Sequence, residues 1–359
     1  MIDLTDRKNI FYWQTDRVLS GEDYVRIFLK RHDVPDNELI DVLNKGITAI
    51  SGTKHISIEP TDENVLKGNV NIVRKVTINN QKYIVRIHPK GVKNGYFFVE
   101  KIALDQARAH GVPTPKVLDV HVATNEKDMD FMLFSVCPGV NMDVFLNNDK
   151  SQESLLLFDS GVNMAKIHEV KVKGFGAFDN TIAKNSNTLV GLHKSYLDFI
   201  HTGLDENLNR LVTFNILDSK RANAMRNVFD THDYEPLDGP RLIHNDFADW
   251  NLLTDGSKIT GVLDWDECHG GDPVADLACW STFFDIERME HFLKGYTSVA
   301  TLPKDYTHRF HFYRLRYTIS KMALRAKRYQ VDKAEFIKEK LEVGKRALAE
   351  ELEFFNLNE

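Results

Sequence analysis

The sequence predicts an α+β fold of two lobes, a small lobe built on an antiparallel sheet with one helix and a larger lobe that is mainly helical. The chain has 359 residues, which is more than one hydrophobic core usually serves. Short alternating strand patterns lie early, within 56–87, and helical spacing of apolar residues dominates the end of the chain. We expect a helical extension at 1–50, the small lobe at 51–135 and the helical lobe at 136–359.

The first half of the chain supplies the elements of the extension and of the small lobe. Residues 1–50 carry helical patterns at 20–30 and 36–47, and we expect this extension to lie on the small lobe. The strands and the helix of the small lobe are predicted at 56–59, 72–78, 83–87, 97–110, 116–120 and 131–134. A turn at 79–81 joins two of these strands, and Gly111 ends the helix.

The second half of the chain is predicted to be mostly helical. Helices are expected at 151–170, 188–211 and 219–229, and again from residue 280 to the end. The segment 174–178 is not expected to cradle a phosphate, because no strand is predicted before it and no helix after it. It is interpreted as a structural turn. One late helix carries a core stripe at Phe312, Leu315, Ile319, Met322 and Ala326. Its basic residues are interpreted as a solvated face: Arg309, Arg314, Arg316, Arg325, Lys327 and Arg328.

Composition argues against several classes of protein. The formal net charge of −6 argues against a general nucleic-acid binder. The three cysteines are odd in number and have no C-x-x-C spacing, which predicts a reducing, cytoplasmic environment without a disulfide framework or a zinc site. No apolar run approaches the length of a membrane span, and the N-terminus has no signal-peptide pattern. We therefore expect neither a nucleic-acid partner nor a membrane partner.

The polar residues that suggest chemistry lie in one late stretch of the chain. Strands at 251–254 and 259–263, joined by a tight turn, should form a hairpin. Asp264 at the end of this hairpin would then lie near Asn251 at its start. Asp246 comes from the preceding loop and can face both of these residues.

These three side chains suit phosphoryl transfer assisted by a metal ion. Mg²⁺ prefers oxygen ligands and takes few of them from protein, so Asn251 and Asp264 are the predicted metal ligands. A separate carboxylate must orient the acceptor hydroxyl and take its proton, and Asp246 is predicted in this role. The pattern H-x-D-x-x-x-x-N, followed by an apolar strand that ends in Asp, is the catalytic-loop and metal-site pattern of kinases. No G-x-x-x-x-G-K-[ST] motif is present, which excludes a P-loop enzyme.

The combined motifs HNDFADWN, GVLDWDE and GGDPVADLA resemble the aminoglycoside phosphotransferase and choline kinase-like family. Within that family the chain is most similar to the hygromycin B phosphotransferase branch, and the likeness covers residues 55–285. The resemblance implies a protein kinase-like fold and transfer of the γ-phosphoryl group of ATP or GTP to a hydroxyl of a small molecule. It also implies that His244 packs and hydrogen-bonds the loop and is not the base. Asp276 is expected to brace the same loop.

The resemblance further implies a nucleotide site in the small lobe. The residues expected to contact the nucleotide are Arg86, Glu100, Gly68, Asn69, Ser135 and Cys137. Arg86 occupies the strand position where kinases place Lys, and Glu100 would tether it from the next helix. The glycine and the asparagine lie where a phosphate-covering loop belongs, and the last two residues mark a hinge whose backbone would bind the adenine edge. Without the resemblance, Arg86 and Glu100 are equally compatible with solvated surface residues.

The expected acceptor is a hydroxylated, cationic small molecule shaped like an aminoglycoside, which would make the protein an antibiotic-resistance enzyme. Asp249, Asp266 and Glu267 provide more carboxylates than Mg²⁺ requires, and such a pocket attracts ammonium groups. The same carboxylates are also compatible with solvated turn residues. Two alternatives remain open at this point: a metabolic kinase for choline, homoserine, a fructosamine or a thio-sugar, and a catalytically inactive nucleotide-binding module.

Overall fold

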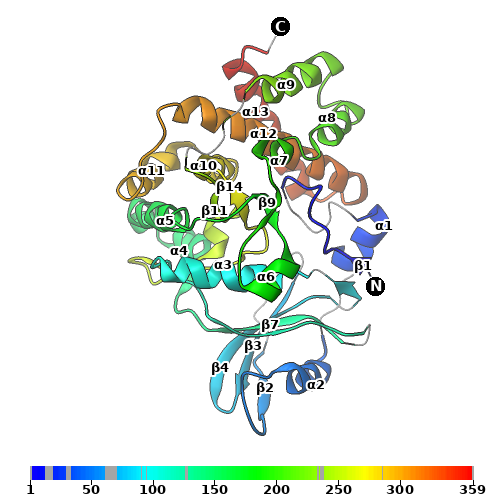
Figure 1. Cartoon of the computed structure of the whole chain (residues 1–359), viewed down its shortest axis with the longest axis vertical. Coiled ribbons are helices and arrows are strands. Elements are labelled where there is room, and N and C mark those ends of the chain that lie inside the picture. The colour runs from blue at the N-terminus through cyan, green and yellow to red at the C-terminus, as the bar shows by residue number, and fades with distance from the viewer. Residues whose placement is uncertain are drawn as a thin grey trace.

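The computed structural model describes residues 2–12, 19–29, 34–60, 71–89, 91–93, 95–125, 128–232, 234, 238–284 and 286–357. They form two lobes, with the small lobe at the bottom of Figure 1 and the helical lobe above it. This arrangement confirms the predicted α+β fold with a small antiparallel sheet and a larger helical part. No helix in the described part of the chain is both long and apolar enough to cross a membrane.

The small lobe is a five-stranded antiparallel sheet in the order β2-β3-β4-β7-β6. Its strands are β2 Ile56–Ile58, β3 Ile72–Ile78, β4 Gln81–Ile87, β6 Val117–His121 and β7 Phe131–Ser135. Helix α2 (Asp36–Gly46) packs on the sheet through Leu39 and Leu43. Asn79 and Asn80 both have positive φ angles (50° and 67°) and form the two-residue turn between β3 and β4. The predictions for these strands are confirmed to within two residues.

Helix α3 (Phe97–Ala109) joins the small sheet to the helical lobe. Its buried residues, Val99 and Ile102 among them, belong to the core of the large lobe and not to that of the sheet. Gly111, with a φ of 78°, follows the end of this helix, as the sequence predicts. The large lobe therefore determines where the side chains of α3 lie.

The large lobe consists of helices around two small antiparallel sheets, in the orders β10-β9-β14-β11 and β13-β12-β8. The strands are β8 Val140–Asn141, β9 Phe175–Phe178, β10 Gly191–His193, β11 Arg241–Ile243, β12 Leu252–Thr254, β13 Ile259–Val262 and β14 His269–Gly271. The helices are α4 Met142–Asn148, α5 Glu153–Ile167, α6 Asn180–Ser186, α7 Tyr196–Ile200, α8 Leu204–Thr213, α9 Ser219–Thr231, α10 Pro273–Trp280, α11 Met289–Thr297, α12 Tyr306–Val331 and α13 Glu335–Phe354. Helix α12 packs against α8, α10 and α13 and carries the predicted core stripe.

Two predictions for this lobe are wrong. The expected turn at 174–178 contains strand β9, which pairs with β10 and β14, and helix α6 follows it. The expected helix at 188–211 is divided into β10, α7 and α8. Glycines explain both differences. A Cβ at Gly191 would lie 2.4 Å from the backbone nitrogen of Phe175, so glycine permits this strand pairing, and Gly203 interrupts the helix with a φ of 65°.

Three of the six basic residues interpreted as a solvated face of α12 are buried, namely Arg309, Arg314 and Arg316, which corrects the interpretation for these three. Arg316 is fully buried and donates hydrogen bonds to the backbone carbonyl groups of Ile200 and Thr202. Arg309 is also buried, and its Nη1 lies 2.6 Å from Asp272 Oδ2. These partners offset the cost of removing the guanidinium groups from water, so the helix tolerates them beside its apolar stripe.

The N-terminal residues contact both lobes. We call residues 2–12 the strap. Its first residues form strand β1 (Ile2–Asp3), which pairs in parallel with β5 (Val92–Lys93) beside the small lobe. Its last residues, Phe11 and Tyr12, belong to the core of the large lobe. Within the predicted extension, α2 thus lies on the small lobe, whereas the strap contacts both lobes; α1 (Gly21–Tyr24) follows later in the chain.

Candidate active site

The loop that follows β11 is held in place by one buried carboxylate from α10. Asp276 accepts hydrogen bonds from the backbone N–H groups of His244 (2.8 Å) and Asn245 (2.9 Å), and it lies 3.2 Å from His168 Nε2. Burial opposes ionisation of Asp276, but the hydrogen bonds from His168 and the loop lower its pKa overall. Asp276 thus braces the loop in the way the sequence predicts.

His244 also has a structural position. Its Nε2 donates to the carbonyl oxygen of Leu263 (3.0 Å), and its Nδ1 accepts from the backbone N–H of Asp246 (3.3 Å). Burial lowers the pKa of this imidazole to about 4, so it is neutral at physiological pH. With both ring nitrogens occupied, His244 has neither a free lone pair nor a suitable pKa for a general base.

Asp246 and Asn251 are in direct contact. Asn251 Nδ2 donates to Asp246 Oδ2 (2.8 Å) and to the carbonyl oxygen of the same residue (2.9 Å). The hairpin β12–β13 then returns the chain, and the backbone N–H of Leu263 donates to the carbonyl oxygen of Asn251 (2.8 Å). Asp264 follows with a φ of 60°, a conformation that few L-residues other than asparagine and aspartate adopt. The hairpin therefore places Asp246, Asn251 and Asp264 at one end, as predicted.

Arg86 connects this end of the hairpin to the small lobe and to α3. Its Nη1 lies 3.1 Å from Asp264 Oδ1, and its Nη2 is hydrogen-bonded to Glu100 Oε2. The side chains of Arg86 and Glu100 are 9% and 2% exposed, whereas that of Asp264 is 43% exposed. Burial opposes the charge of Arg86, but the two carboxylates raise its pKa overall. A permanent cation thus lies between the small lobe and the exposed carboxylate.

The electrostatics of the site favour a bound cation. Burial raises the pKa of Asp246 to about 6, and the positive charge of Lys321 opposes this rise. Partial removal from water and the negative charge of Asp266 raise the pKa of Asp264 well above its usual range. A metal ion between Asp264 and the Oδ1 side of Asn251 would relieve this crowding of carboxylates.

The available ligands fit Mg²⁺. Among the described residues, no group of three or more His, Cys, Asp and Glu side chains could hold a metal ion. One carboxylate and one amide oxygen, completed by water and phosphate oxygens, is a normal Mg²⁺ arrangement and a poor one for zinc. Asn251 and Asp264 would hold the ion, as the sequence predicts.

The comparisons with known proteins agree with this geometry. The APH family model, described as the phosphotransferase enzyme family, matches residues 63–341. The chain belongs to this family. The predicted resemblance is therefore confirmed, and the matched segment includes Arg86, Glu100 and the whole catalytic loop.

The relatives of this family member are distant. Hygromycin-B 4-O-kinase of Escherichia coli is 21% identical over 235 residues, a match that covers 63% of this chain and 65% of the relative, less than two thirds of its length. A thermostable mutant of aminoglycoside phosphotransferase APH(4)-Ia, in a ternary complex with AMP-PNP and hygromycin B, has a TM-score of 0.58 at 17% identity and covers 82% and 95% of the two chains. A putative fructosamine-3-kinase from Thermobifida fusca YX-ER1 has a TM-score of 0.55 at 17% identity, with coverage of 87% and 100%. These structural matches show a shared fold.

The segment predicted to be the hinge follows β7 and lies beside the hairpin. Ser135 is engaged, because its backbone N–H donates to the carbonyl oxygen of Lys116 and its hydroxyl accepts from the N–H of the same residue. Cys137 packs on Gly261, where an added Cβ would lie 3.2 Å from the Cys137 Cβ, and burial raises the pKa of its thiol. That the backbone at Ser135 and Cys137 binds the adenine edge stays a prediction. The predicted loop residues Gly68 and Asn69 lie outside the described residues.

The three predicted acceptor-side carboxylates have different surroundings. Asp249 is buried and forms an ion pair with Arg288 (2.7 Å), so this carboxylate already has a cationic partner. Asp266 is 9% exposed, and its backbone carbonyl oxygen accepts a hydrogen bond from Arg7. Burial and the charges of Asp246 and Asp266 raise the pKa of Glu267 well above its usual range. Negative charge thus gathers around Glu267, whereas Asp249 has Arg288 as its partner.

Sequence reasoning missed two cations near the site. Lys321 is buried under the loop, where its Nζ donates to Thr282 Oγ1 (2.6 Å) and lies 3.5 Å from the ring centre of Phe283. The sequence did not indicate a role for Lys321, because this residue lies among the apolar residues of the α12 core stripe. The other cation is Arg7, from the strap, which no motif marks.

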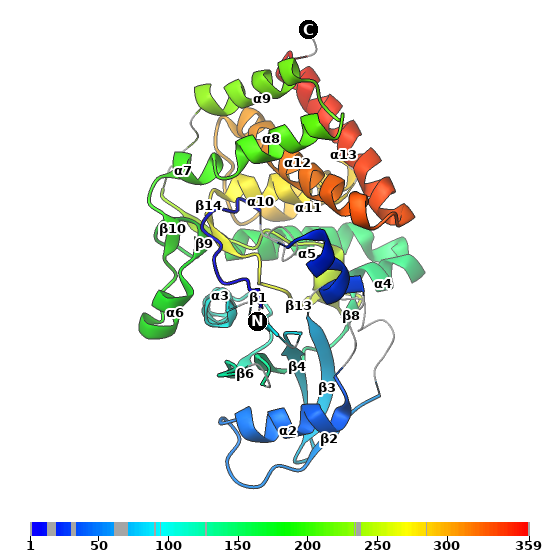
Figure 2. The same cartoon turned by 90° about the vertical axis from the view of Figure 1, so that its right-hand side faces the viewer.

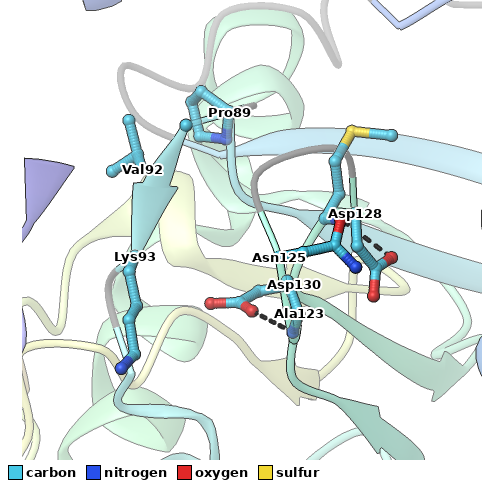
Figure 3. A pocket seen from close by; sticks show the side chains of 9 residues that line it. Pro89, Val92, Lys93, Ala123, Asn125, Asp128 and Asp130 are labelled. Carbon is cyan, nitrogen blue, oxygen red and sulfur yellow. Dashed lines mark hydrogen bonds between the residues drawn. The ribbon is translucent and has the colours of Figure 1, made fainter. Parts of the chain in front are cut away.

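A cavity elsewhere in the small lobe is too small for a substrate. Figure 3 shows it between β5 and the turn before β7, with Pro89, Lys93, Asn125 and Asp130 among its lining residues. Its volume is about 10 Å³, which is room for one water molecule. The contacts among polar side chains, and not a cavity, define the candidate active site as the surface where Asp246, Asn251, Asp264 and Arg86 meet.

Proposed function

We propose that this phosphotransferase transfers the γ-phosphoryl group of ATP or GTP to a hydroxyl group of a small molecule. The observation that carries this proposal is one connected set of contacts. Asn251 donates to Asp246, and Arg86 bridges Glu100 and Asp264. These contacts hold together the candidate base Asp246, the candidate metal ligands Asn251 and Asp264, and the candidate phosphate-binding cation Arg86. The complex of a similar fold with AMP-PNP supports an adenine nucleotide as donor.

Each residue has a distinct task in this reaction. Asp246 accepts a hydrogen bond from the acceptor hydroxyl, aims its oxygen at the γ-phosphorus and takes its proton. Asn251 holds the Asp246 carboxylate through Nδ2 and leaves its Oδ1 for Mg²⁺. The metal ion, when bound, neutralises charge on the phosphate oxygens. Arg86, tethered by Glu100, clamps the phosphates of the nucleotide, and positioning with charge neutralisation provides most of the rate enhancement.

The acceptor that we propose is a hydroxylated, cationic molecule of the aminoglycoside type. Support comes from the relatives that bind or phosphorylate hygromycin B and from the negative charge around Asp246. Since Asp249 is paired with Arg288, we assign the attraction of ammonium groups to Glu267 and Asp266. On this proposal the protein would confer resistance to an aminocyclitol antibiotic.

A second candidate is a metabolic kinase of the same fold. The similarity to a putative fructosamine-3-kinase favours this alternative, since a fructosamine also combines hydroxyl groups with an amine. A panel of acceptors separates the two candidates. We would incubate the protein with Mg²⁺ and ATP or GTP, and with hygromycin B, other aminocyclitols, fructosamines, neutral sugars, choline and homoserine, at low and high salt.

The readout is the mass gain of one phosphate group on the acceptor, with Asp246→Asn as the matched inactive control. We expect transfer to an aminocyclitol, with an apparent affinity that weakens as salt rises. Preference for a neutral or anionic acceptor would reject the cationic acceptor and leave the kinase assignment intact. If the protein neither transfers phosphate nor hydrolyses the nucleotide, it is a nucleotide-binding module and the kinase assignment is wrong.

A further inference from the structure

The strap has no counterpart in the matched family segment, because residues 2–12 precede residue 63. Figure 2 shows this N-terminal segment in dark blue, rising from β1 along the large lobe. It begins beside the small lobe, where the backbone N–H of Leu4 donates to the carbonyl oxygen of Lys93 (2.7 Å). Further along, the carbonyl oxygen of Lys8 accepts from His193 Nε2 (2.7 Å). The strap is thus attached to both lobes by specific hydrogen bonds.

Arg7 is the side chain through which the strap reaches the active site. It is 2% exposed, and its Nη1 donates to the carbonyl oxygen of Asp266. Its guanidinium carbon lies 3.7 Å from the ring centre of Tyr96, within the range of a cation–π contact. Burial lowers the pKa of Arg7, while the nearby charges of Asp266 and Glu100 oppose this effect. The guanidinium therefore adds positive charge next to the carboxylates of the site.

Tyr96, which contacts Arg7, is also hydrogen-bonded to the backbone of two other segments of the chain. Its hydroxyl donates to the carbonyl oxygen of Cys268 (2.9 Å) and accepts from the backbone N–H of Phe178 (2.7 Å). Tyr96 is also the residue that immediately precedes α3, the helix that carries Glu100. Arg7 and Tyr96 together hold the backbone at Asp266 and Cys268.

The segment held in this way follows Asp264 directly. Asp264 has a positive φ and an exposed side chain, so its own packing contributes little to its position. The contact with Arg86 positions its carboxylate, and the carbonyl oxygen two residues later is held by Arg7. Both α3 and the backbone after Asp264 are therefore linked through a residue of the strap.

The far end of the strap is anchored in the core. The ring of Phe11 lies 5.0 Å from that of Tyr317, and the guanidinium of Arg316 lies 4.0 Å from the ring centre of Phe11. The ring of Tyr12 meets Tyr317 edge-on at 5.9 Å. Because these rings are buried against α12, this end of the strap is part of the core of the large lobe and contributes to its stability.

We propose that Arg7 is a positioning residue for phosphoryl transfer, which holds α3 and residues 264–268 together so that Asp264, Glu100 and Arg86 keep the geometry for the metal–nucleotide complex. This inference rests on the proposed kinase function. Arg7 acts through the backbone of Asp266 and through Tyr96, without touching a substrate. The strap thereby makes the nucleotide site depend on a part of the chain outside the family segment.

The test compares Arg7→Gln and Arg7→Lys with two controls in the full-length protein. Lys8→Gln removes the same charge from an exposed neighbour, and Phe11→Leu weakens the anchor in the core without changing the contact with Asp266. The measurements are Mg²⁺-dependent binding of AMP-PNP, ATP hydrolysis without acceptor, and the thermal midpoint of unfolding. None of these measurements requires that the acceptor be known.

We expect Arg7→Gln to weaken Mg²⁺-dependent binding or hydrolysis by about 10- to 100-fold, in the range that small misplacements of reacting groups produce. Arg7→Lys should recover part of the loss, while Lys8→Gln should match the wild type. Phe11→Leu should lower the thermal midpoint and leave the nucleotide KM unchanged, which separates positioning from stability. If Arg7→Gln does not fold, Tyr96→Phe removes the hydrogen bonds of the Tyr96 hydroxyl with Cys268 and Phe178 but keeps the ring under Arg7, and it should show the same Mg²⁺ effect in weaker form.

Three results would overturn this inference in distinguishable ways. If the wild type binds and hydrolyses the nucleotide but Arg7→Gln, or Tyr96→Phe in its place, behaves identically, Arg7 is not a positioning residue and the kinase function stands. If the losses in Arg7→Gln and Phe11→Leu both follow the fall in thermal midpoint, the role of Arg7 is structural only. A wild-type protein that neither binds nor hydrolyses the nucleotide would overturn the kinase proposal and this inference together.

Discussion

Replacing Arg86 by alanine should cost the protein both stability and nucleotide binding, and the structure allows the two losses to be separated. Glu100 is 2% exposed and forms an ion pair with Arg86. Without the guanidinium its carboxylate remains buried without this partner, and breaking a buried pair in this way costs about 3–5 kcal/mol. Total stabilities are about 5–15 kcal/mol, so Arg86→Ala should shift the urea midpoint strongly.

The double variant Arg86→Met, Glu100→Gln removes the buried charge while it keeps the volume of both side chains. Replacing a complete buried ion pair by neutral groups is often close to neutral for stability, so we expect most of the urea midpoint to return. Nucleotide binding should stay weak, because no cation faces the phosphates. Arg86→Lys keeps the charge but not the planar fork, and its nucleotide KM should lie between those of the wild type and the alanine variant.

The assay combines urea unfolding with titration of AMP-PNP in the presence of Mg²⁺. Recovery of nucleotide affinity in the double variant would refute the reasoning, because it would show that Arg86 supports the site only through stability. An unchanged nucleotide KM in Arg86→Ala would also refute it and would indicate that another cation, such as Lys75, binds the phosphates.

Three further substitutions test the remaining assignments. Asp246→Asn should reduce phosphoryl transfer by at least ~10²-fold with nucleotide affinity retained, and near-normal turnover would remove this residue as the base. Asp264→Ala should weaken AMP-PNP binding in Mg²⁺ more than in its absence, whereas equal binding in both conditions would place the metal elsewhere. Asp276→Asn should lower the urea midpoint by the equivalent of about 1–3 kcal/mol, since a neutral amide holds the two loop N–H groups less well; an unchanged midpoint would contradict its bracing role.

Local patterns of the sequence predicted the sheet of the small lobe, helix α3 and the hairpin β12–β13. Alternation with period two, a turn at Asn79–Asn80 and a stop at Gly111 act over a few residues, so they can be read without the rest of the chain. They failed at 188–211, where Gly203 and the close approach of Gly191 to Phe175 override helical spacing. The choice there depends on neighbours that the local pattern does not contain.

The sequence by itself determined which polar side chains meet at the candidate site. The spacing of Asp246, Asn251 and Asp264 around a short hairpin restricts them to one end of it, whatever the rest of the chain does. The sequence also placed Arg86 and Glu100 in the predicted small lobe. Only the family resemblance suggested that these two side chains contact each other.

Only the tertiary structure decided which charged side chains meet at the candidate site and which are paired elsewhere. Arg86 meets Asp264 across 178 residues, and Arg7 meets the backbone of Asp266 across 259 residues. Asp249 pairs with Arg288 and is thereby withdrawn from the acceptor side. Hydrophobic periodicity identifies the face of an element that is buried, but the partner of a buried charge depends on how the complete core packs. A charge in low dielectric is stable only where that packing brings its counter-charge or hydrogen-bond partner.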